Sequence, residues 1–338
     1  MKAIKTAKGG TMILSGDVGG TKTNLALYSS GGGGLRRRTA RSFRSYDYPS
    51  LEAILEVFLA GREKISLACI GVAGPVKGGK SRLTNLSWSV DEESVRRTCG
   101  ARAAFLINDL QALAFSVPFL RPGSFATLQK GEPDPEGVVA VAAAGTGFGQ
   151  AALLRSGGGY IPMASEGGHV DFAARNERET ALLSHLRKAH GRVSAERVVS
   201  GPGLFGVYRF LREAEGRGEV PRVEARLASE DAPRVIVSSA LAGRSATCRE
   251  AVRFFCRLFG AAAGNLALQY HATGGVVLGG GLSPAILPAL VKGEFLDAFL
   301  DKGRFRGFLE KVPVKVILDE SAALLGAARF AVGMSRRG

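Results

Sequence analysis

Two glycine-rich turns in this sequence carry threonine hydroxyls and follow apolar runs. Residues 17–21 read Asp-Val-Gly-Gly-Thr, and residues 145–149 read Gly-Thr-Gly-Phe-Gly. Backbone N–H groups approach a phosphate closely where side chains are small, and a threonine hydroxyl adds one more donor. Asp17 stands beside the first turn, where a carboxylate can hold Mg²⁺ directly or through water. The pair predicts two phosphate-binding turns, although one such turn by itself is more often a simple hairpin turn.

Two polar residues, Asn108 and Asp109, follow the apolar run 105–107 and precede the helical stretch 110–117. They therefore stand at the carboxyl end of an expected strand, where open α/β sheets place their sites. A carboxylate at this position can accept the proton of an attacking alcohol. The alternative is that the pair is an ordinary helix cap, for which Asp109 in particular is well placed, and for the pair taken alone this alternative is preferred.

A third polar group, Ser-Glu-Gly-Gly-His-Val-Asp at residues 165–171, gathers a carboxylate and an imidazole around two glycines. Glu166 and His169 can donate to and accept from the hydroxyls of a sugar. Two other interpretations stay open: a metal site made by Glu166, His169 and Asp171, and a structural turn with solvated charges.

A literal match to the Walker A pattern occurs at residues 74–81, Gly-Pro-Val-Lys-Gly-Gly-Lys-Ser. A true P-loop continues directly into a helix, whereas residues 81–90 show no helical length. Pro75 also removes one backbone donor. We therefore expect a surface hairpin turn here.

The order of apolar runs predicts a mixed α/β protein in which one scheme occurs twice: an apolar strand, a Gly/Thr turn and another apolar strand. A third glycine cluster, Gly279, Gly280 and Gly281, follows the expected strand 275–278 and precedes a helix start at Ser283. The stretch 118–135 is rich in Pro, Gly and polar residues and is the predicted crossing between two lobes. The predicted strands are 12–14, 24–28, 66–72, 105–107, 137–144 and 151–154, and the predicted helices are 51–59, 110–117 and 319–332.

Composition favours a folded chain in a reducing compartment. With 338 residues, 46% of them hydrophobic, the chain can bury a sizeable core and is expected to form two lobes. Its four cysteines show no C-x-x-C spacing and predict buried reduced thiols. No signal-peptide pattern and no uninterrupted run of ~20 apolar residues is present, so we expect a cytoplasmic protein without a membrane partner.

The formal net charge of +15 raises nucleic acid as a partner. The basic residues are spread along the chain, however, and the dense run Arg36-Arg37-Arg38 lies beside glycines 31–34 in an expected hairpin loop. No nucleic-acid-binding motif accompanies the charge, so no nucleic-acid partner is expected. A basic chain still attracts anionic nucleotides.

In order, these motifs resemble the bacterial glucokinase family of the actin-like sugar-kinase superfamily, over residues 12–330. The turn at residues 17–21 looks like the first phosphate motif, that at 145–147 like the second, and 279–281 like the adenosine motif. Four further segments of this chain resemble the sugar-site segments of the family: Thr84-Asn85, Ile107-Asn108-Asp109, Glu166 to His169 and Ser194-Ala195-Glu196-Arg197.

The resemblance implies a two-lobed actin-like (ribonuclease H-like) α/β ATPase fold with a cleft between the lobes. The small domain would comprise residues 12–118 and 319–338 and the large domain 119–318, after a basic extension at 1–11. It implies ATP-dependent phosphorylation of glucose with Mg²⁺, and a homodimer. Asp109 would be the general base. The implied sugar residues are Asn85, Asn108, Asp109, Glu166, His169 and Glu196, and the implied nucleotide residues are Asp17 (also the metal ligand), Gly19, Gly20, Thr21, Lys22, Gly145, Thr146, Gly147, Gly279, Gly280 and Gly281.

Two positions depart from the family pattern: Lys22 and Asn24 stand where Asn and Arg are usual. Lys22 makes the turn look more like the related repressor/open-reading-frame/kinase group, but the cysteine-rich zinc motif of that group is absent. Two alternatives remain at this stage. One is a kinase for another hexose or an amino sugar, and the other is a non-catalytic sugar-sensing protein of the same fold.

Overall fold

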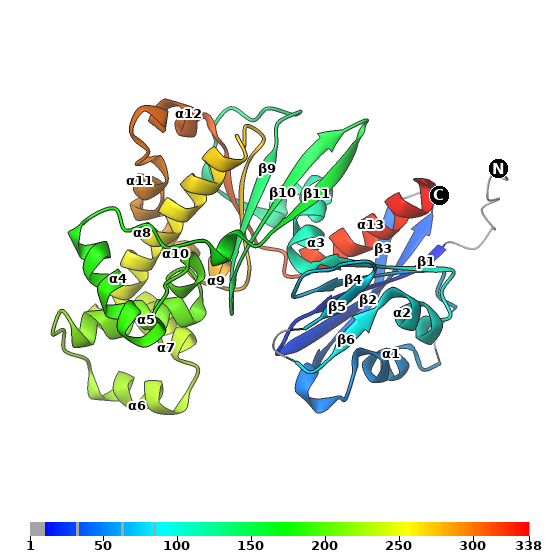
Figure 1. Ribbon diagram of the computed structural model, residues 1–338, viewed down its shortest axis with the longest axis horizontal. Coiled ribbons are helices and arrows are strands. Elements are labelled where there is room, and N and C mark those ends of the chain that lie inside the picture. The colour runs from blue at the N-terminus through cyan, green and yellow to red at the C-terminus, as the bar shows by residue number, and fades with distance from the viewer. Residues whose placement is uncertain (1–10, 32–33, 62–63, 84–85, 338) are drawn as a thin grey trace. The chain divides into compact units, whose positions relative to one another are not determined.

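The computed structural model describes residues 11–31, 34–61, 64–83 and 86–337. For Arg336 and Arg337 it describes only the backbone. The chain divides into two compact units (Figure 1). Unit 1 comprises Met1–Leu120 and Glu320–Gly338, and unit 2 comprises Arg121–Asp319. The sequence placed these divisions after residues 118 and 318. Of the basic extension expected at 1–11, only Thr11 lies within the described residues, and it begins the first strand.

Unit 1 is built on a five-stranded sheet of described residues in the order β3-β2-β1-β4-β7. Its strands are β1 (Thr11–Val18), β2 (Lys22–Gly31), β3 (Gly34–Arg44), β4 (Leu67–Val72) and β7 (Ala103–Asn108). β1 is antiparallel to β2 and parallel to β4, and β4 is parallel to β7. The carboxyl ends of β1, β4 and β7 therefore meet at one edge of the sheet.

Helices cover both faces of this sheet, because consecutive strand residues point to opposite sides. Leu14 of β1 belongs to the core under α1 (Leu51–Leu59) and α2 (Glu92–Cys99). Its neighbour Ile13 belongs to the core under α13 (Ala322–Arg337), which also packs on α3 (Asp109–Ser116). The predicted final helix is thus confirmed. A separate small hairpin pairs β5 (Lys80–Arg82) with β6 (Ser89–Asp91).

Unit 2 repeats the strand relations of unit 1 and adds a strand. Within the described residues its sheet has the order β11-β10-β9-β12-β13-β8, in which β9 is antiparallel to β10 and parallel to β12. These pairings confirm the predicted repetition of strand, Gly/Thr turn and strand. The strands are β8 (Phe125–Gln129), β9 (Val139–Ala144), β10 (Phe148–Ser156), β11 (Gly159–Ser165), β12 (Gly275–Gly279) and β13 (Val314–Ile317).

The sequence missed three of these strands, β8, β11 and β13. The stretch 118–135 was predicted to be only a crossing between lobes, yet β8 lies inside it and pairs antiparallel with β13. The turn residues that dominate the composition flank this short strand and do not interrupt it, since Pro122 begins a 3₁₀ turn before it and Gly131 follows it in a left-handed conformation. Further short 3₁₀ turns are Ser45–Asp47, Val117–Phe119 and Gly303–Phe305.

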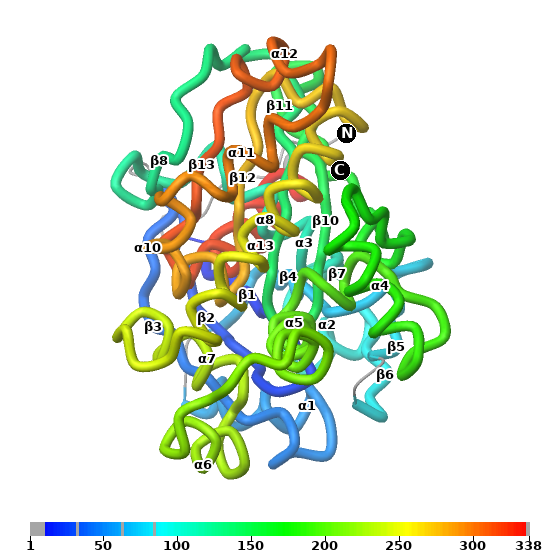
Figure 2. The backbone as a smooth tube through the Cα atoms, turned by 90° about the vertical axis from the view of Figure 1, so that its left-hand side faces the viewer, coloured from blue at the N-terminus to red at the C-terminus, as the bar shows by residue number. Residues whose placement is uncertain are grey.

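Helix α8 (Ala246–Gln269) is the centre of the unit 2 core and packs against α5, α7 and α11 (Figures 1 and 2). It has the length and apolar composition of a membrane span, but 72% of its most apolar window is buried inside the protein. That burial identifies α8 as a core helix. The remaining helices are α4 (Glu177–His190), α5 (Gly201–Glu213), α6 (Pro221–Ser229), α7 (Ala232–Leu241), α9 (Leu282–Ala285), α10 (Leu287–Leu290), α11 (Glu294–Leu300) and α12 (Arg306–Lys311).

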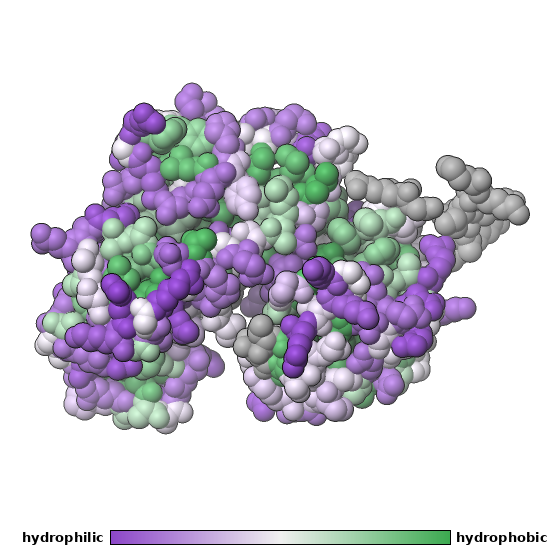
Figure 3. Space-filling model, in the orientation of Figure 1, coloured by the Kyte–Doolittle hydropathy of each residue, from purple (hydrophilic) through white to green (hydrophobic). Residues whose placement is uncertain are grey.

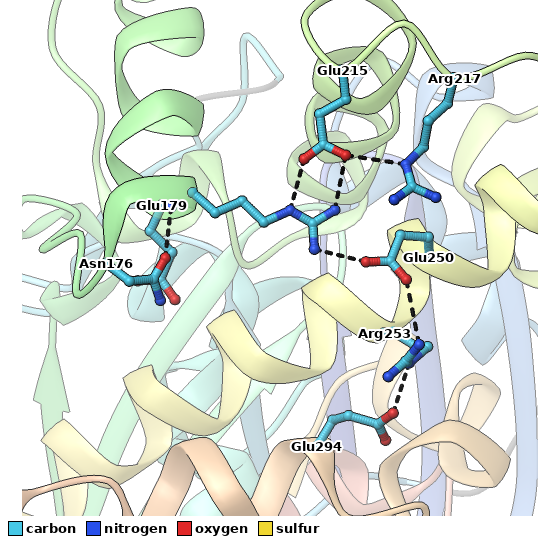
Figure 4. A network of polar contacts seen from close by, with 8 residues as sticks. Asn176, Glu179, Glu215, Arg217, Glu250, Arg253 and Glu294 are labelled. Atoms are coloured by element: carbon cyan, nitrogen blue, oxygen red, sulfur yellow. Dashed lines mark hydrogen bonds and ion pairs between the residues drawn. The ribbon is translucent and has the colours of Figure 1, made fainter.

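Ion pairs connect the helices of unit 2 at their polar margin (Figure 4). Arg178 on α4 contacts Glu215, just beyond α5, and Glu250 on α8, at 2.7 Å in each case. Arg253 on α8 continues the network to Glu294 on α11. Hydrophilic residues cover much of the surface seen in Figure 3. All four cysteines are free and buried, which confirms the predicted reduced thiols, and burial raises the pKa of the Cys69 thiol.

One ion pair of unit 2 is buried. The side chain of Glu179 is 1% exposed, and its carboxylate accepts from the backbone N, Nε and Nη2 of Arg175. The substitution Arg175→Met leaves this carboxylate buried without its guanidinium, so we expect the free energy of unfolding to fall by about 3 kcal/mol in urea denaturation. The matched substitution Arg306→Met breaks the exposed pair with Glu310, and we expect a change of no more than about 0.5 kcal/mol. Equal effects of the two substitutions would contradict this account.

Candidate active site

The predicted residues of unit 1 gather at the edge where β1, β4 and β7 end. Asp17 is level with Gly71 across the parallel pair β1–β4, and Val72 is level with Asn108 across β4–β7. A side chain at Gly71 would come within 3.5 Å of the Asp109 Cα and of the Gly16 carbonyl oxygen. These registers, together with the direct step from β7 into α3, place Asp17 and Asp109 at one edge of the sheet.

Asp17 is a half-buried carboxyl with little polar compensation. Burial raises its pKa, and a 3.4 Å hydrogen bond from Asn24 Nδ2 opposes that shift. A neutral amide compensates a buried charge only in part, so the site favours the arrival of a cation. Asn24, one of the two departures from the family pattern, is therefore in contact with the predicted metal ligand.

The first glycine turn is fixed by a residue that the sequence did not single out. Ser45 Oγ donates to the Gly19 carbonyl at 2.9 Å, and Ser45 N donates to the Thr21 carbonyl at 3.1 Å. Gly19 N donates to the Lys22 carbonyl at 2.9 Å. Within the described part of the chain, the amides of Gly20 and Thr21 donate to no protein acceptor. These two N–H groups are available to an anion.

The pair does contain the helix cap, which confirms that alternative, but the cap is Asn108, so its placement at Asp109 is wrong. Asn108 Oδ1 accepts from Leu110 N at 2.9 Å, and the Gln111 side chain accepts from Asn108 N, which completes a capping box. Asn108 Nδ2 also donates to the Gly74 carbonyl at 3.2 Å. Asp109 is the first residue of α3, at the helix end that favours a negative charge.

The Walker-like segment forms a tight hairpin, as predicted. Lys77 and Lys80 exchange backbone hydrogen bonds of 2.9 and 3.1 Å, and the chain continues into β5, not into a helix. The predicted sugar residue Asn85 lies outside the described residues.

In unit 2, two glycine motifs that are far apart in sequence lie side by side. β9 and β12 are parallel neighbours, and Gly279 is level with Ala143, so both strands end at the same edge. Gly280 has φ +76°, and a side chain there would clash with the backbone of Ala144. The cluster 279–281 therefore contacts the residue that precedes the second glycine turn.

The second turn is supported by the first turn of α5. Gly201 N donates to the Gly145 carbonyl at 2.7 Å, and Gly145 N donates to the Gly147 carbonyl at 2.9 Å. The amides of Thr146 and Gly147 have no acceptor among the described residues. The positive end of the α5 dipole adds to the attraction for an anion at this turn.

Phe148 connects the second turn to both sugar-site segments of unit 2. Its N donates to Glu196 Oε2 at 2.9 Å, and its carbonyl oxygen lies where a side chain at position 168 would clash. Its buried ring packs edge-on against Phe259. Glu196 and the Glu166–His169 segment are thus both held against the backbone of one residue. Glu196 came from the resemblance alone, because its contact with Phe148 leaves no local signal in the sequence.

Glu166 and His169 are both exposed. His169 ends a 3₁₀ turn (Gly167–His169), and Glu166 directly precedes this turn. Arg192 pairs with Asp171 at 2.7 Å and donates to the His169 carbonyl at 2.7 Å, so the Asp171 carboxylate supports the loop. The described residues contain no group of three or more His, Cys, Asp or Glu that could hold a metal ion. The metal-site interpretation of Glu166, His169 and Asp171 therefore has no structural support.

Known proteins match the chain over nearly its whole length. A sequence profile described as Glucokinase matches residues 14–334. A glucokinase of Nostoc punctiforme is 39% identical over 334 residues, covering 94% of this chain and 98% of the relative. The crystal structure of a glucokinase from an Antarctic psychrotroph superposes with a TM-score of 0.81 at 31% identity, covering 95% of this chain and 99% of the other. A Streptomyces griseus glucokinase of the ROK family, in complex with glucose and AMPPNP, shares the fold, with a TM-score of 0.65 at 21% identity, and covers 98% of this chain and 100% of the other.

The strand order of both units and the glycine turns at their sheet edges define a sugar kinase with the actin-like ATPase fold. The chain belongs to the glucokinase family. It is an enzyme that phosphorylates glucose with ATP.

The cost of burying the charged Asp17 carboxylate leads to a prediction about the stability of the protein. A carboxyl whose pKa is raised on folding binds its proton more tightly in the folded state, so its cost is absent at low pH and grows as pH rises through the folded pKa. Asp17→Asn removes that cost, and we expect the Tm of the ligand-free protein to rise by ~2 °C or more at pH 7, with a smaller gain at pH 4. Calorimetry at the two pH values measures this. Glu132→Gln, at an exposed carboxylate, serves as the control and should change Tm little.

Gly168 tests the contact between the Glu166–His169 segment and Phe148. In Gly168→Ala the new Cβ must displace backbone atoms, so we expect kcat/KM for glucose to fall at least about 10-fold while circular dichroism stays unchanged. Gly307→Ala is the matched control, because a side chain there meets nothing within 4 Å. Wild-type kinetics in Gly168→Ala would show that this contact does not position the sugar residues.

Proposed function

We propose that Asp109 is the general base of glucose phosphorylation and that the turns at 19–21 and 145–147 hold the phosphates of ATP. The observation that carries this proposal is the pair of unpartnered amides in each turn, Gly20 and Thr21 in unit 1 and Thr146 and Gly147 in unit 2. Each pair follows a strand at the sheet edge that also carries predicted substrate residues. Preorganised N–H groups of this kind stabilise the charge that develops on a transferring phosphoryl group.

Transfer requires that a glucose hydroxyl attack the γ-phosphorus while the bond from that phosphorus to the bridging oxygen breaks. Asp109 accepts the hydroxyl proton, and ADP leaves with the electron pair of the broken bond. We place the 6-hydroxyl in the attacking position. Exclusion of water from the site directs the phosphoryl group to the sugar.

The other hydroxyls of glucose are assigned to Asn85, Asn108, Glu166, His169 and Glu196. Asn108 uses its oxygen for the cap and one amide hydrogen for Gly74, which leaves the second amide hydrogen for the sugar. Glu196 uses one oxygen, Oε2, for Phe148 N, and its other oxygen can accept from a sugar hydroxyl.

Asp17 is the residue that we assign to Mg²⁺, directly or through water. Its half-buried carboxylate, balanced only by the Asn24 amide, suits a cation better than solvent. When bound, Mg²⁺ neutralises charge on the phosphates. We assign Lys22 to the phosphates as well, and Gly279, Gly280 and Gly281 to the adenosine. The AMPPNP bound to the Streptomyces griseus protein supports a nucleotide site in this fold.

We further propose that the enzyme works as a homodimer in the cytoplasm, with glucose and ATP as its partners and without nucleic acid or membrane. Four free, buried cysteines are consistent with a reducing compartment. Family membership favours glucose over another hexose or an amino sugar, and favours an enzyme over a sugar sensor.

The test is Asp109→Asn in a coupled ADP-release assay on glucose, mannose, fructose and N-acetylglucosamine. Loss of the base should lower kcat for glucose by about 10²–10⁴-fold, while the KM for ATP stays within about 3-fold of wild type. Glucose binding by calorimetry should survive, because Asn keeps the shape of the side chain and one acceptor oxygen for a sugar hydroxyl. If Asp109→Asn keeps most of the wild-type turnover, Asp109 is not the general base. If the wild-type enzyme has a higher kcat/KM for another sugar of the panel, that sugar and not glucose is the preferred substrate.

A further inference from the structure

Unit 2 contains a cavity of about 500 Å³ that the proposed function uses only along part of its wall, at Thr146 and Glu196. The last turns of α4, the 3₁₀ turn Ala195–Arg197 and α5 line it. Its volume falls within the range of small-molecule sites. Glu166 and His169 do not line it, so it is not the whole sugar site.

The cavity wall carries more positive than negative charge. Lys188, Arg197 and Arg209 line it, against the carboxylates of Glu196 and Glu213. Both carboxylates are already engaged. Glu213 pairs with Arg209 at 2.8 Å and lies 3.6 Å from His185, and Glu196 accepts from Phe148 N.

The remaining cations have no such partner. Among the residues that the structure describes, the side chains of Lys188 and Arg197 make no hydrogen bond or ion pair. His190, which also lines the cavity, has a pKa lowered by burial and then by Arg197 and Arg209. The influence of these two guanidinium groups on His190 agrees with the positive charge of the residues that line this end of the cavity.

We propose that this cavity binds a small anion with a phosphoryl group, held by Lys188, Arg197 and Arg209. A guanidinium fork matches two phosphate oxygens, and a lysine adds a mobile point charge. A volume of about 500 Å³ leaves room for an organic group beyond the phosphate, so both inorganic phosphate and a phosphate monoester fit the chemistry.

The same cavity borders residues that we assign to the phosphate turn and to the sugar site. Thr146 of the phosphate turn and Glu196 of the sugar site also line it. Arg197, which follows Glu196 in the chain, would contact the anion. The cavity and the proposed sugar site therefore share one short 3₁₀ turn.

Isothermal titration calorimetry tests the binding directly. Inorganic phosphate, and separately fructose 6-phosphate, is titrated into the full chain with glucose and Mg-AMPPNP at saturation, so that the substrate sites are filled. The variant Lys188→Gln/Arg209→Gln removes two of the three cations. The control Lys292→Gln/Arg244→Gln removes the same charge from exposed positions elsewhere in unit 2.

We expect wild type and control to bind at least one probe, and the cavity variant to bind it at least about 10-fold more weakly. Without added anion, the cavity variant should keep the kcat/KM of wild type. Tighter binding of fructose 6-phosphate identifies a phosphorylated metabolite as the ligand, and tighter binding of phosphate identifies the free ion.

Equal affinity in the cavity variant and the control, or no heat of binding in wild type up to ~10 mM of either probe, overturns the proposal. Because no turnover is measured in the titration, that result leaves the kinase assignment intact. Failure of the Asp109→Asn test, conversely, leaves the cavity unaffected.

Discussion

The site in unit 2 depends on the backbone of Phe148. Its N–H holds Glu196, its carbonyl leaves no room for a side chain at position 168, and its ring is fixed in the core beside Phe259. Gly147, the preceding residue, would place a Cβ 2.5 Å from Glu196 Oε2. Glycine is therefore required at 168, where a Cβ would clash with the Phe148 backbone, independently of any bound ligand. At 147 a Cβ would instead push the Glu196 carboxylate away from the Phe148 amide. Phe148 thus connects Glu196 and the Glu166–His169 segment to the hydrophobic core, in addition to the support that Gly201 gives to the second turn.

Unit 1 meets the same requirement with different residues. Both units place a glycine turn between two antiparallel strands, with a parallel strand beside the first. In unit 1 the hydroxyl and amide of Ser45 hold the turn, whereas in unit 2 the amide of Gly201, at the start of α5, does so. The repeated scheme thus preserves the strand geometry, while the bracing contact is local to each unit. This explains why a phosphate-binding turn is recognisable from its own sequence and its support is not.

The sequence predicted the elements whose cause is local. Helix α1 has the predicted bounds because Ser50 caps it and its apolar residues keep a helical spacing, and strand β7 ends at Asn108, one residue after its apolar run 105–107. Strand β8 was missed because its pairing with β13 is a contact between distant segments. Ser45 and Glu196 carry no local signal for the same reason, and only the family resemblance pointed to Glu196. The sequence could not decide which of Asn108 and Asp109 caps the helix, because Asn and Asp are both favoured at an N-cap, and the structure shows that Asn108 does so.

The net positive charge of the chain and the negative charge of Asp17 act on an approaching nucleotide at different distances. Many arginines are neutralised within helices by glutamates one turn away, as in the pair Arg226–Glu230. The formal excess of +15 remains, and it attracts anionic nucleotides from a distance. Close to the first turn the sign reverses, because the Asp17 carboxylate would repel a phosphate that arrived without a cation. With Mg²⁺ assigned to Asp17 as proposed, attraction at long range and repulsion at contact would favour a nucleotide that carries this ion.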